Sequence, residues 1–335
     1  MEHHPSSSSL KLPVFDISKP LSDSSLTSLN EACREWGFFH VSNHGVSSHL
    51  FEKLRRLSGD VFGLSYETKM KVGPCSLLNT YTPHFIASPF FESLRVSGPD
   101  FFSSANSSID VLFDQTLHSE FSEILKEYGE KMTELSEKII KAILASFKND
   151  LDKKYYESEF KNCNGYFRIN NYTHPTTTEI FRQDHHHHRD EDEGEEEGLG
   201  MHTDMSCITI VNQDEVGGLQ VRSNGGDWFD INPNADTLVV NVGDLLHAWS
   251  DGRLRSSQHR VVMNRRSFTN RFSVAFFWCF ADEKVVYAPD DVAGVRVFRS
   301  FTCGDYLRFR ESNEKGKFEK VGYTVKDFAG LDGGT

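Results

Sequence analysis

The chain has 335 residues with a formal net charge of −13; 38% of its residues are hydrophobic and 12% are aromatic. That length and hydrophobic content provide for a large buried core, which excludes an intrinsically disordered protein. Most of the acidity is local, because residues 183–197 hold eight acidic side chains and one Arg. The charge is therefore no argument for a cationic partner.

The N-terminus lacks the basic and then apolar order of a signal peptide, and no apolar run is long enough to span a bilayer. We expect a cytosolic monomer that can also enter the nucleus, with a small-molecule substrate and no membrane or nucleic-acid partner. Six cysteines are scattered without paired spacing, which predicts reduced thiols and no disulfide framework. They are Cys33, Cys75, Cys163, Cys207, Cys279 and Cys303.

Residues 1–160 are predicted to form a helical and mixed region, with helices packed onto a few strands. Apolar side chains recur at helical spacing from Leu26 to Trp36, where Gly37 is a plausible stop, and again from Leu50 to Val61. The longest helix should run from about residue 118 to residue 147. Its single apolar stripe predicts that it braces the outside of a β-barrel.

Residues 161–300 are predicted to form the main domain. From about Gly165 to Phe280, short strands alternate with Gly, Asn and Asp turns, which is typical of an antiparallel double-stranded β-helix. The fold class is thus mainly β with flanking helices, around a jelly-roll, cupin-like core. Residues 301–335 are predicted to form a C-terminal helix and tail, with the helix covering one rim of the core.

Residues 183–198 are polar and of low complexity, with four adjacent histidines, and they predict a mobile loop. Metal binding by those histidines is a weaker alternative to a solvated linker.

His202 and Asp204 precede a β-branched run, and side chains two apart on a strand share a face. His259 lies near the start of another strand-like run. Two histidines and one carboxylate form the facial triad typical of non-haem Fe(II) oxygenases, although the same ligands could hold catalytic zinc. His247 is interpreted as a structural or cavity-edge residue in a turn, not as a ligand.

Arg271 and Ser273 share one face of a strand that is otherwise apolar and aromatic. A guanidinium there needs an anion, and its fork geometry suits a carboxylate, to which the serine hydroxyl adds a hydrogen bond. A small dicarboxylate co-substrate fits, which weighs against zinc. The alternative for an isolated Arg-x-Ser pair is a structural ion pair.

Together these residues resemble the plant Fe(II)/2-oxoglutarate-dependent dioxygenases, in the order His202-x-Asp204, His259 and Arg271-x-Ser273. The likeness covers almost the whole chain and is closest to gibberellin oxidases and gibberellin-20-oxidase-like proteins. Further segments similar to family signatures are 36–39, 43–46, 167–172, 217–221, 242–244, 249–252 and 282–286. The stretch before His202 departs from the family, where it is usually shorter and richer in proline, so the substrate-side loop is expected to differ in shape.

The resemblance implies that His202, Asp204 and His259 bind Fe(II) and are therefore the catalytic residues. It implies that Arg271 and Ser273 hold the distal carboxylate of 2-oxoglutarate, with Tyr172 and Asn170 as further contacts. Dioxygen would be the second co-substrate and ascorbate the reductant. The reaction would hydroxylate or desaturate a small metabolite, with release of succinate and CO2.

For the prime substrate, the hypothesis is a hydrophobic diterpenoid acid of the gibberellin type. The residues expected near it are Tyr81, Phe85, Phe90, Arg95, Met205 and Phe280. Arg95 would pair with its carboxylate, although an ordinary surface ion pair is the alternative. A flavonoid, an alkaloid or an auxin-like acid could replace the gibberellin. A non-catalytic binding protein on the same fold and a zinc hydrolase are the rivals from other classes.

Overall fold

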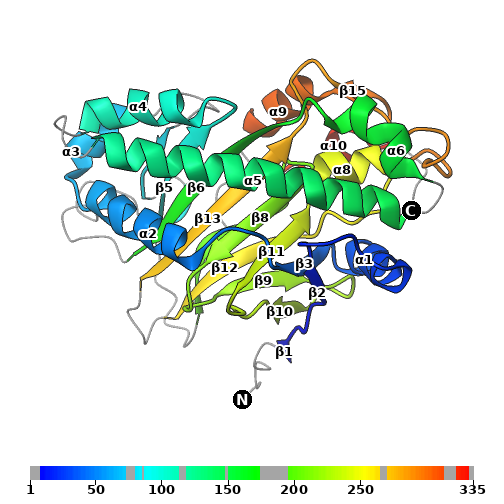
Figure 1. The fold of residues 1–335 in the computed structure, drawn as a ribbon, viewed down its shortest axis with the longest axis horizontal. Helices are drawn as coiled ribbons and strands as arrows, with labels where there is room; N and C mark the ends of the chain where they lie inside the picture. The colour runs from blue at the N-terminus through cyan, green and yellow to red at the C-terminus, as the bar shows by residue number, and fades with distance from the viewer. Residues whose placement is uncertain are drawn as a thin grey trace.

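The protein is described by a computed structural model that covers residues 8–72, 80–84, 87–112, 118–147, 150–173, 195–264, 270–312 and 322–331. Two β-sheets form its centre, and a long helix runs across one face of the larger sheet (Figure 1). Within these ranges, no helix is long and apolar enough to cross a membrane.

The strands are β1 (Ser8–Ser9), β2 (Val14–Asp16), β3 (Phe38–Ser42), β4 (Tyr81–Thr82), β5 (Phe91–Ser97), β6 (Asn164–Tyr172), β7 (Glu195–His202), β8 (Ile208–Gln213), β9 (Leu219–Arg222), β10 (Trp228–Asp230), β11 (Thr237–Val242), β12 (His259–Asn264), β13 (Arg271–Cys279), β14 (Val285–Val286) and β15 (Phe301–Thr302). The helices are α1 (Asp23–Glu35), α2 (Ser48–Phe62), α3 (Tyr66–Lys69), η1 (Met70–Val72), α4 (Phe101–Leu112), α5 (His118–Ser146), α6 (Leu151–Tyr155), η3 (Tyr156–Phe160), α8 (Asp244–Trp249), α9 (Cys303–Glu311) and α10 (Val325–Ala329).

The larger sheet has the order β2-β3-β11-β8-β13-β6-β5-β4, and the smaller sheet has the order β1-β10-β9-β12-β7. Their strands are antiparallel except for the pairs β2–β3 and β1–β10. This arrangement agrees with the predicted double-stranded β-helix. Strands β2 to β5, from the predicted helical region, complete the larger sheet by pairing β3 with β11 and β5 with β6. The division of the chain at residue 160 stays a prediction.

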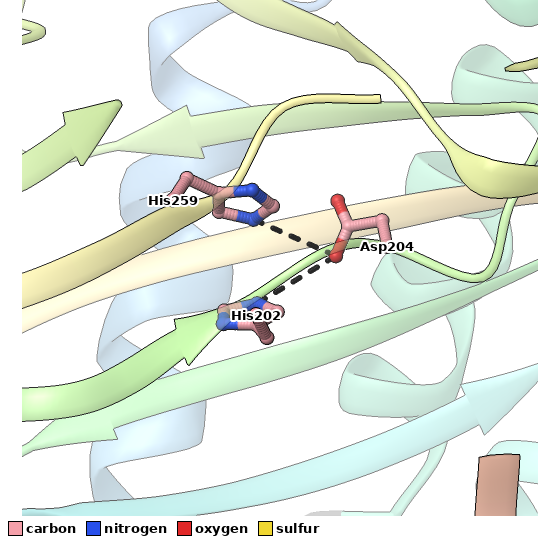
Figure 2. A group of neighbouring side chains, drawn as sticks. All are labelled: His202, Asp204 and His259. Atoms are coloured by element: carbon pink, nitrogen blue, oxygen red, sulfur yellow. Dashed lines mark ion pairs between the residues drawn. The ribbon is translucent and has the colours of Figure 1, made fainter. Parts of the chain in front are cut away.

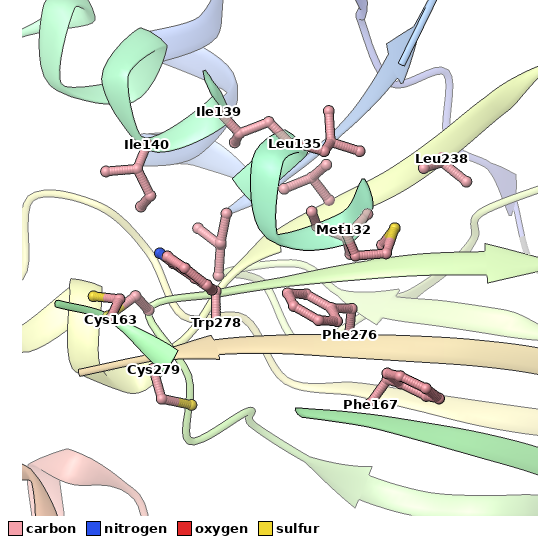
Figure 3. Packing of buried hydrophobic residues seen from close by; sticks show 14 of the residues in the cluster. Met132, Leu135, Ile139, Ile140, Cys163, Phe167, Leu238, Phe276, Trp278 and Cys279 are labelled. Atoms are coloured by element: carbon pink, nitrogen blue, oxygen red, sulfur yellow. The ribbon is translucent and has the colours of Figure 1, made fainter. Parts of the chain in front are cut away.

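Helix α5 covers the outer face of the larger sheet, where its side chains Met132, Leu135 and Ile139 pack with Phe276 of β13 in one core (Figure 3). Helices α1, α2 and α4 pack against α5 in turn. Because strand side chains alternate, the neighbours of Phe276 in β13 point the other way, toward a cavity. The packing therefore agrees with the prediction that the long helix braces the outside of the barrel.

The predicted helix stop at Gly37 is confirmed, since α1 ends at Glu35 and Gly37 has a φ of 66°. A Cβ at this position would lie 2.0 Å from the carbonyl oxygen of Arg255, so only glycine fits. This close approach joins the helical region to the loop that leads into β12.

The predicted loop over residues 183–198 is wrong at its C-terminal end. Strand β7 already begins at Glu195, which pairs in register with Asn264 of β12. Ladder hydrogen bonds use the backbone, so a partner strand can extend a sheet through a polar segment whose composition predicts a loop. Residues 183–194, with the four histidines, lie outside the described residues. Five cysteines are buried free thiols, and the sixth, Cys75, also lies outside.

A buried ion pair ties α3 to β5. Lys69 Nζ lies 2.7 Å from a carboxylate oxygen of Glu92, and the two side chains are only 4% and 2% exposed. Tyr81 Oη and Asn171 Nδ2 also donate to that carboxylate, at 2.6 and 2.9 Å. The pair is therefore buried and hydrogen-bonded to further groups, which is the setting in which removing one partner costs most.

We expect Lys69→Met to lower the free energy of unfolding by about 3–5 kcal/mol, because it leaves the Glu92 carboxylate buried without its cation. Urea denaturation measures this directly. The control is Lys161→Met, which removes an exposed pair with Glu157 and should change stability by about 1 kcal/mol or less. If both substitutions lowered the free energy of unfolding equally, the buried pair would contribute no more to stability than the exposed pair.

Candidate metal and co-substrate site

The two strands β7 and β12 bring His202 and His259 together. The residues are direct partners in the antiparallel register, and their ring centroids lie 4.3 Å apart. Asp204 lies two residues past the end of β7, in the loop that leads to β8. The prediction that His202 and Asp204 share a strand face is therefore wrong for Asp204, which reaches the same point through a bend of the loop.

The three side chains converge on one point (Figure 2). Asp204 Oδ1 lies 3.7 Å from His202 Nε2 and 3.6 Å from His259 Nε2. On the far side of each ring, Nδ1 lies 2.7 Å from the Gly200 carbonyl oxygen in His202 and 3.0 Å from the Ser257 carbonyl oxygen in His259. A carbonyl only accepts, so Nδ1 carries the hydrogen in both rings, and the Nε2 of a neutral ring presents its lone pair toward Asp204. One ligand atom from each residue lies within 4.8 Å of the others, which could hold a metal ion.

The charge state of the site suits a cation. Burial raises the pKa of the Asp204 carboxyl, but the two histidines outweigh burial and hold this pKa well below its usual range. Burial, together with repulsion from His259, lowers the pKa of His202 to about 4. Burial also lowers the pKa of His259, but attraction to Asp204 outweighs it and leaves that pKa raised. The carboxylate is thus charged at neutral pH and one imidazole is neutral.

A second polar centre surrounds Arg271, whose side chain is 1% exposed. Its Nε donates to the Gly217 carbonyl at 2.6 Å, and its two terminal nitrogens donate to Ser273 Oγ and Gln213 Oε1, each at 3.0 Å. Its guanidinium carbon lies 4.8 Å from the ring centroid of Tyr172. Over the described part of the chain, no carboxylate forms a direct ion pair with Arg271, and its hydrogen-bond partners are neutral. The buried carboxylate of Asp214 attracts the guanidinium from farther away.

Unsatisfied polar atoms lie around the same guanidinium. Asn170 Nδ2 donates weakly to Ser273 Oγ at 3.4 Å, while Asn170 Oδ1 and Gln213 Nε2 are buried without a hydrogen-bond partner. Such groups cost about 1–3 kcal/mol each when left unpaired. A spare N–H donor beside a guanidinium that makes no direct ion pair with the described residues fits a carboxylate ligand, as predicted for Arg271 and Ser273.

One cavity of about 1060 Å³ connects the two centres. It is lined by His202, Asp204 and His259 and also by Arg271 and Ser273. Its wall on β6 consists of alternate residues, because the intervening Phe167 and Ile169 belong to the core that the sheet shares with α5. These wall residues are Tyr166, Arg168, Asn170 and Tyr172.

Of the six residues predicted near the substrate, Arg95 and Met205 line this cavity. The prediction is wrong for Tyr81, which pairs in register with Leu94 on the face turned away from the cavity and donates to the buried Glu92. Its neighbour Thr82 lines the cavity instead.

Two more of these residues pack into the core without lining the cavity. Phe280 follows the end of β13, and its ring packs against Phe160 in the helical layer. Phe90 packs against the hydrophobic cluster of the smaller sheet. Phe85 lies outside the described residues.

His247 lies in the short helix α8 instead of the predicted turn. Its ring contacts Phe298, and its Nδ1 lies 2.5 Å from the Leu254 carbonyl oxygen. It is not part of the group that could hold a metal. A structural role fits this position, as predicted.

Three arginines of the cavity wall were not predicted: Arg168, Arg308 and Arg310. The position of Arg168, two residues before Asn170 on one strand, is a signal that could have found it. The other two lie on α9, the helix predicted to cover one rim of the core, but the sequence does not indicate which of its side chains reach the cavity.

A sequence model of the 2OG-Fe(II) oxygenase superfamily matches residues 167–280, and one described as non-haem dioxygenase in morphine synthesis N-terminal matches residues 12–88. The Gibberellin 20-oxidase-like protein of Arabidopsis thaliana is 68% identical over 334 residues, which cover 97% of this chain and 99% of that relative. Gibberellin 20 oxidase 2 of the same plant is 32% identical over 322 residues, which cover 91% of this chain and 78% of the relative.

Among solved structures, the dioxygenase for auxin oxidation from rice superposes with a TM-score of 0.71 at 26% identity, covering 96% of this chain and all of the other. Dioxygenase for auxin oxidation 1 from Arabidopsis thaliana, in a complex with 2-oxoglutarate, gives 0.69 at 27% identity, with coverage of 85% and 98%. These matches confirm the double-stranded β-helix fold and imply Fe(II) and 2-oxoglutarate as cofactor and co-substrate. The chain belongs to the 2-oxoglutarate/Fe(II)-dependent oxygenases and is an enzyme of that family.

Proposed function

We propose that this dioxygenase oxidises a hydrophobic carboxylic acid, of the gibberellin type of diterpenoid, by hydroxylation or desaturation. His202, Asp204 and His259 would hold Fe(II), and Arg271 and Ser273 would hold 2-oxoglutarate, with Tyr172 and Asn170 beside it. The observation that carries the assignment is that one cavity is faced by a two-histidine, one-carboxylate cluster and by a buried guanidinium that makes no direct ion pair with the described residues.

Bound Fe(II) supplies the oxidative decarboxylation of 2-oxoglutarate by dioxygen to succinate and CO2, coupled to oxidation of a substrate C–H bond. The protein residues bind, orient and exclude water. His202, Asp204 and His259 would hold the metal, and the Nδ1 hydrogen bonds fix the direction of both imidazoles. Asn241 Nδ2, 2.8 Å from Asp204 Oδ2, fixes the carboxylate. Ascorbate is the reductant that we expect to sustain turnover.

The cavity supports a hydrophobic substrate. Its volume of about 1060 Å³ exceeds what 2-oxoglutarate alone would fill, and it suits a polycyclic molecule beside the co-substrate. Much of the wall is apolar and aromatic. The wall residues of this kind include Phe38, Phe91, Leu199, Met205, Leu219, Val261, Ala275, Phe277 and Leu307.

Two arginines on the same wall support a negatively charged substrate. Arg95 and Arg168 are direct partners in the antiparallel register of β5 and β6, an arrangement in which like charges repel. Arg168 donates to the hydroxyls of Thr82 and Ser93, at 3.2 and 3.1 Å, and forms no ion pair within the described part of the chain. Arg95 stacks 3.8 Å from the ring centroid of Tyr166. A substrate carboxylate near this pair would be attracted by both guanidinium groups, so we extend the predicted role of Arg95 to Arg168.

We expect Arg168→Gln and Arg95→Gln each to raise KM for an acidic substrate roughly tenfold to hundredfold, the cost of losing a hydrogen bond to a charged group. Neither substitution should change KM for the methyl ester of the same substrate, because the ester carries no negative charge. Succinate formation measures both. A parallel loss for acid and ester would show that the arginines shape the cavity without binding a carboxylate.

The identity of the acid is tested with a panel of gibberellin precursors, auxin-like acids, flavonoids and alkaloids. The gibberellin proposal draws on the 68% identical relative, and the auxin-like alternative draws on the likeness to the rice dioxygenase for auxin oxidation. If only an auxin-like acid stimulated succinate formation, the substrate would still be a carboxylic acid, but the proposal of a diterpenoid would be rejected. Stimulation only by an uncharged flavonoid would reject both.

A further inference from the structure

Helix α9 reaches the loop that carries the proposed iron ligands. Arg310, near its C-terminal end, donates from Nη2 to the carbonyl oxygen of Thr203 at 2.8 Å and from Nη1 to Thr203 Oγ1 at 3.1 Å. Thr203 is the residue between His202 and Asp204. The C-terminal helix thus holds both the backbone and the side chain of the segment that links two of the three ligands.

Asp244, at the start of α8, accepts hydrogen bonds from both Arg310 and Thr203. Its Oδ2 accepts from Arg310 Nη1 at 2.7 Å and from Thr203 Oγ1 at 2.9 Å, and it also accepts a hydrogen bond from Tyr306 Oη. Its backbone N–H donates to the carbonyl oxygen of Asp204 at 2.8 Å. The side chains of Arg310 and Asp244 are only 11% and 2% exposed, so water replaces these bonds poorly.

Thr203 and Asp204 need such support because they lie past the end of β7, where no strand ladder fixes them. A buried loop carbonyl must find a donor, and for Thr203 that donor is Arg310. We propose that Arg310 is a positioning residue for the metal site, which fixes the 202–204 segment so that Asp204 meets the two imidazoles. This inference rests on the proposed iron site and is independent of the substrate.

The competing role for Arg310 is substrate binding, because it also lines the cavity. Its hydrogen bonds argue against that role. Nη1 is shared among Asp244, Thr203 Oγ1 and, at 3.0 Å, Tyr306 Oη, while Nη2 is used by the Thr203 carbonyl. Its charge is already paired with a buried carboxylate, unlike that of Arg168. A third role, plain structural support, predicts lost stability without a specific change at the metal.

The test compares Arg310→Gln and Arg310→Lys with Arg308→Gln. Arg308 lies on the same helix and also borders the cavity, but it is exposed and pairs with Asp305, so it is a matched control. Fe(II) binding is titrated under argon in the presence of 2-oxoglutarate and followed by the visible charge-transfer absorption of the complex. Thermal unfolding of each apoprotein is recorded alongside, as the measure of structural damage.

We expect Arg310→Gln to weaken Fe(II) binding roughly tenfold to hundredfold, as for loss of a group that orients metal ligands. Arg310→Lys should recover part of the loss, because an ammonium can still pair with Asp244 and bond one oxygen. Arg308→Gln should bind as the wild type does. If Arg310→Gln does not fold, the Fe(II) affinity of Arg310→Lys is compared with that of Arg308→Gln instead, and it should be the weaker of the two.

Wild-type Fe(II) affinity with raised substrate KM in the Arg310 variants would overturn the inference in favour of substrate binding. Lower melting temperature with unchanged Fe(II) affinity would overturn it in favour of plain structural support. Failure of the proposed iron site looks different, since wild type would then bind Fe(II) no better than His202→Ala.

Discussion

Asp204→Ala and His259→Ala are expected to abolish Fe(II) binding and succinate formation. Each removes one of the three side chains whose ligand atoms lie within 4.8 Å of one another, and the described residues offer no other such group. The loss should exceed the roughly 10–100-fold that removal of a supporting partner costs. Metal content after anaerobic reconstitution, together with succinate formation, measures the effect.

His247→Ala is the matched control, because His247 is another largely enclosed imidazole whose Nδ1 meets a backbone carbonyl. It should retain its iron. If it lost iron as completely as His259→Ala, the ligand set would be wrong. If the wild-type protein instead retained zinc and formed no succinate, this would favour the alternative of a zinc hydrolase.

Arg271→Ala is expected to raise KM for 2-oxoglutarate by the equivalent of about 2–5 kcal/mol, the cost of truncating one partner of a buried, hydrogen-bonded charge pair. Arg271→Lys should fall between, because an ammonium cannot present two parallel donors to a carboxylate. Initial rates of succinate formation against 2-oxoglutarate concentration measure the change. Fe(II) binding should persist, because Arg271 lies on β13 and none of its hydrogen bonds involves a ligand residue.

Arg260→Ala serves as the control for Arg271→Ala. Arg260 lies on β12, next to His259, but its guanidinium bonds Gln220 and Glu197 and stacks on Trp228 outside the cavity. It should leave KM for 2-oxoglutarate near the wild-type value. An equal rise in both variants would mean that the change acts through the sheet and that Arg271 does not bind the co-substrate.

The motif residues were predictable because their chemistry is written in residue type and spacing. A His-x-Asp pair or an Arg-x-Ser pair alone has other common uses, but both together with a second histidine, in this order, indicate a metal site beside an anion site. The strand alternation that places Arg271 and Ser273 in the cavity also follows from sequence. The position of Asp204 in a loop does not follow from the sequence, because pairing with β12 determines where β7 ends.

The substrate side was less predictable because it depends on register and on distant packing. Tyr81 turns away from the cavity since β4 pairs with β5 in the register that places it opposite Leu94, and a one-residue shift would reverse its face. Arg310 contacts Thr203 across 107 positions of sequence, and only the docking of α9 creates that contact. Such long-range contacts have no local signature.

Succinate formation by the purified protein with Fe(II), ascorbate and 2-oxoglutarate, with His202→Ala as the blank, tests the central claim most directly. We expect iron-dependent turnover that is low without a prime substrate and that one gibberellin precursor stimulates, while the blank stays flat. Succinate formation by wild type no greater than by His202→Ala, across the full panel of acids, would contradict the assignment of this cluster as the iron site of a working dioxygenase.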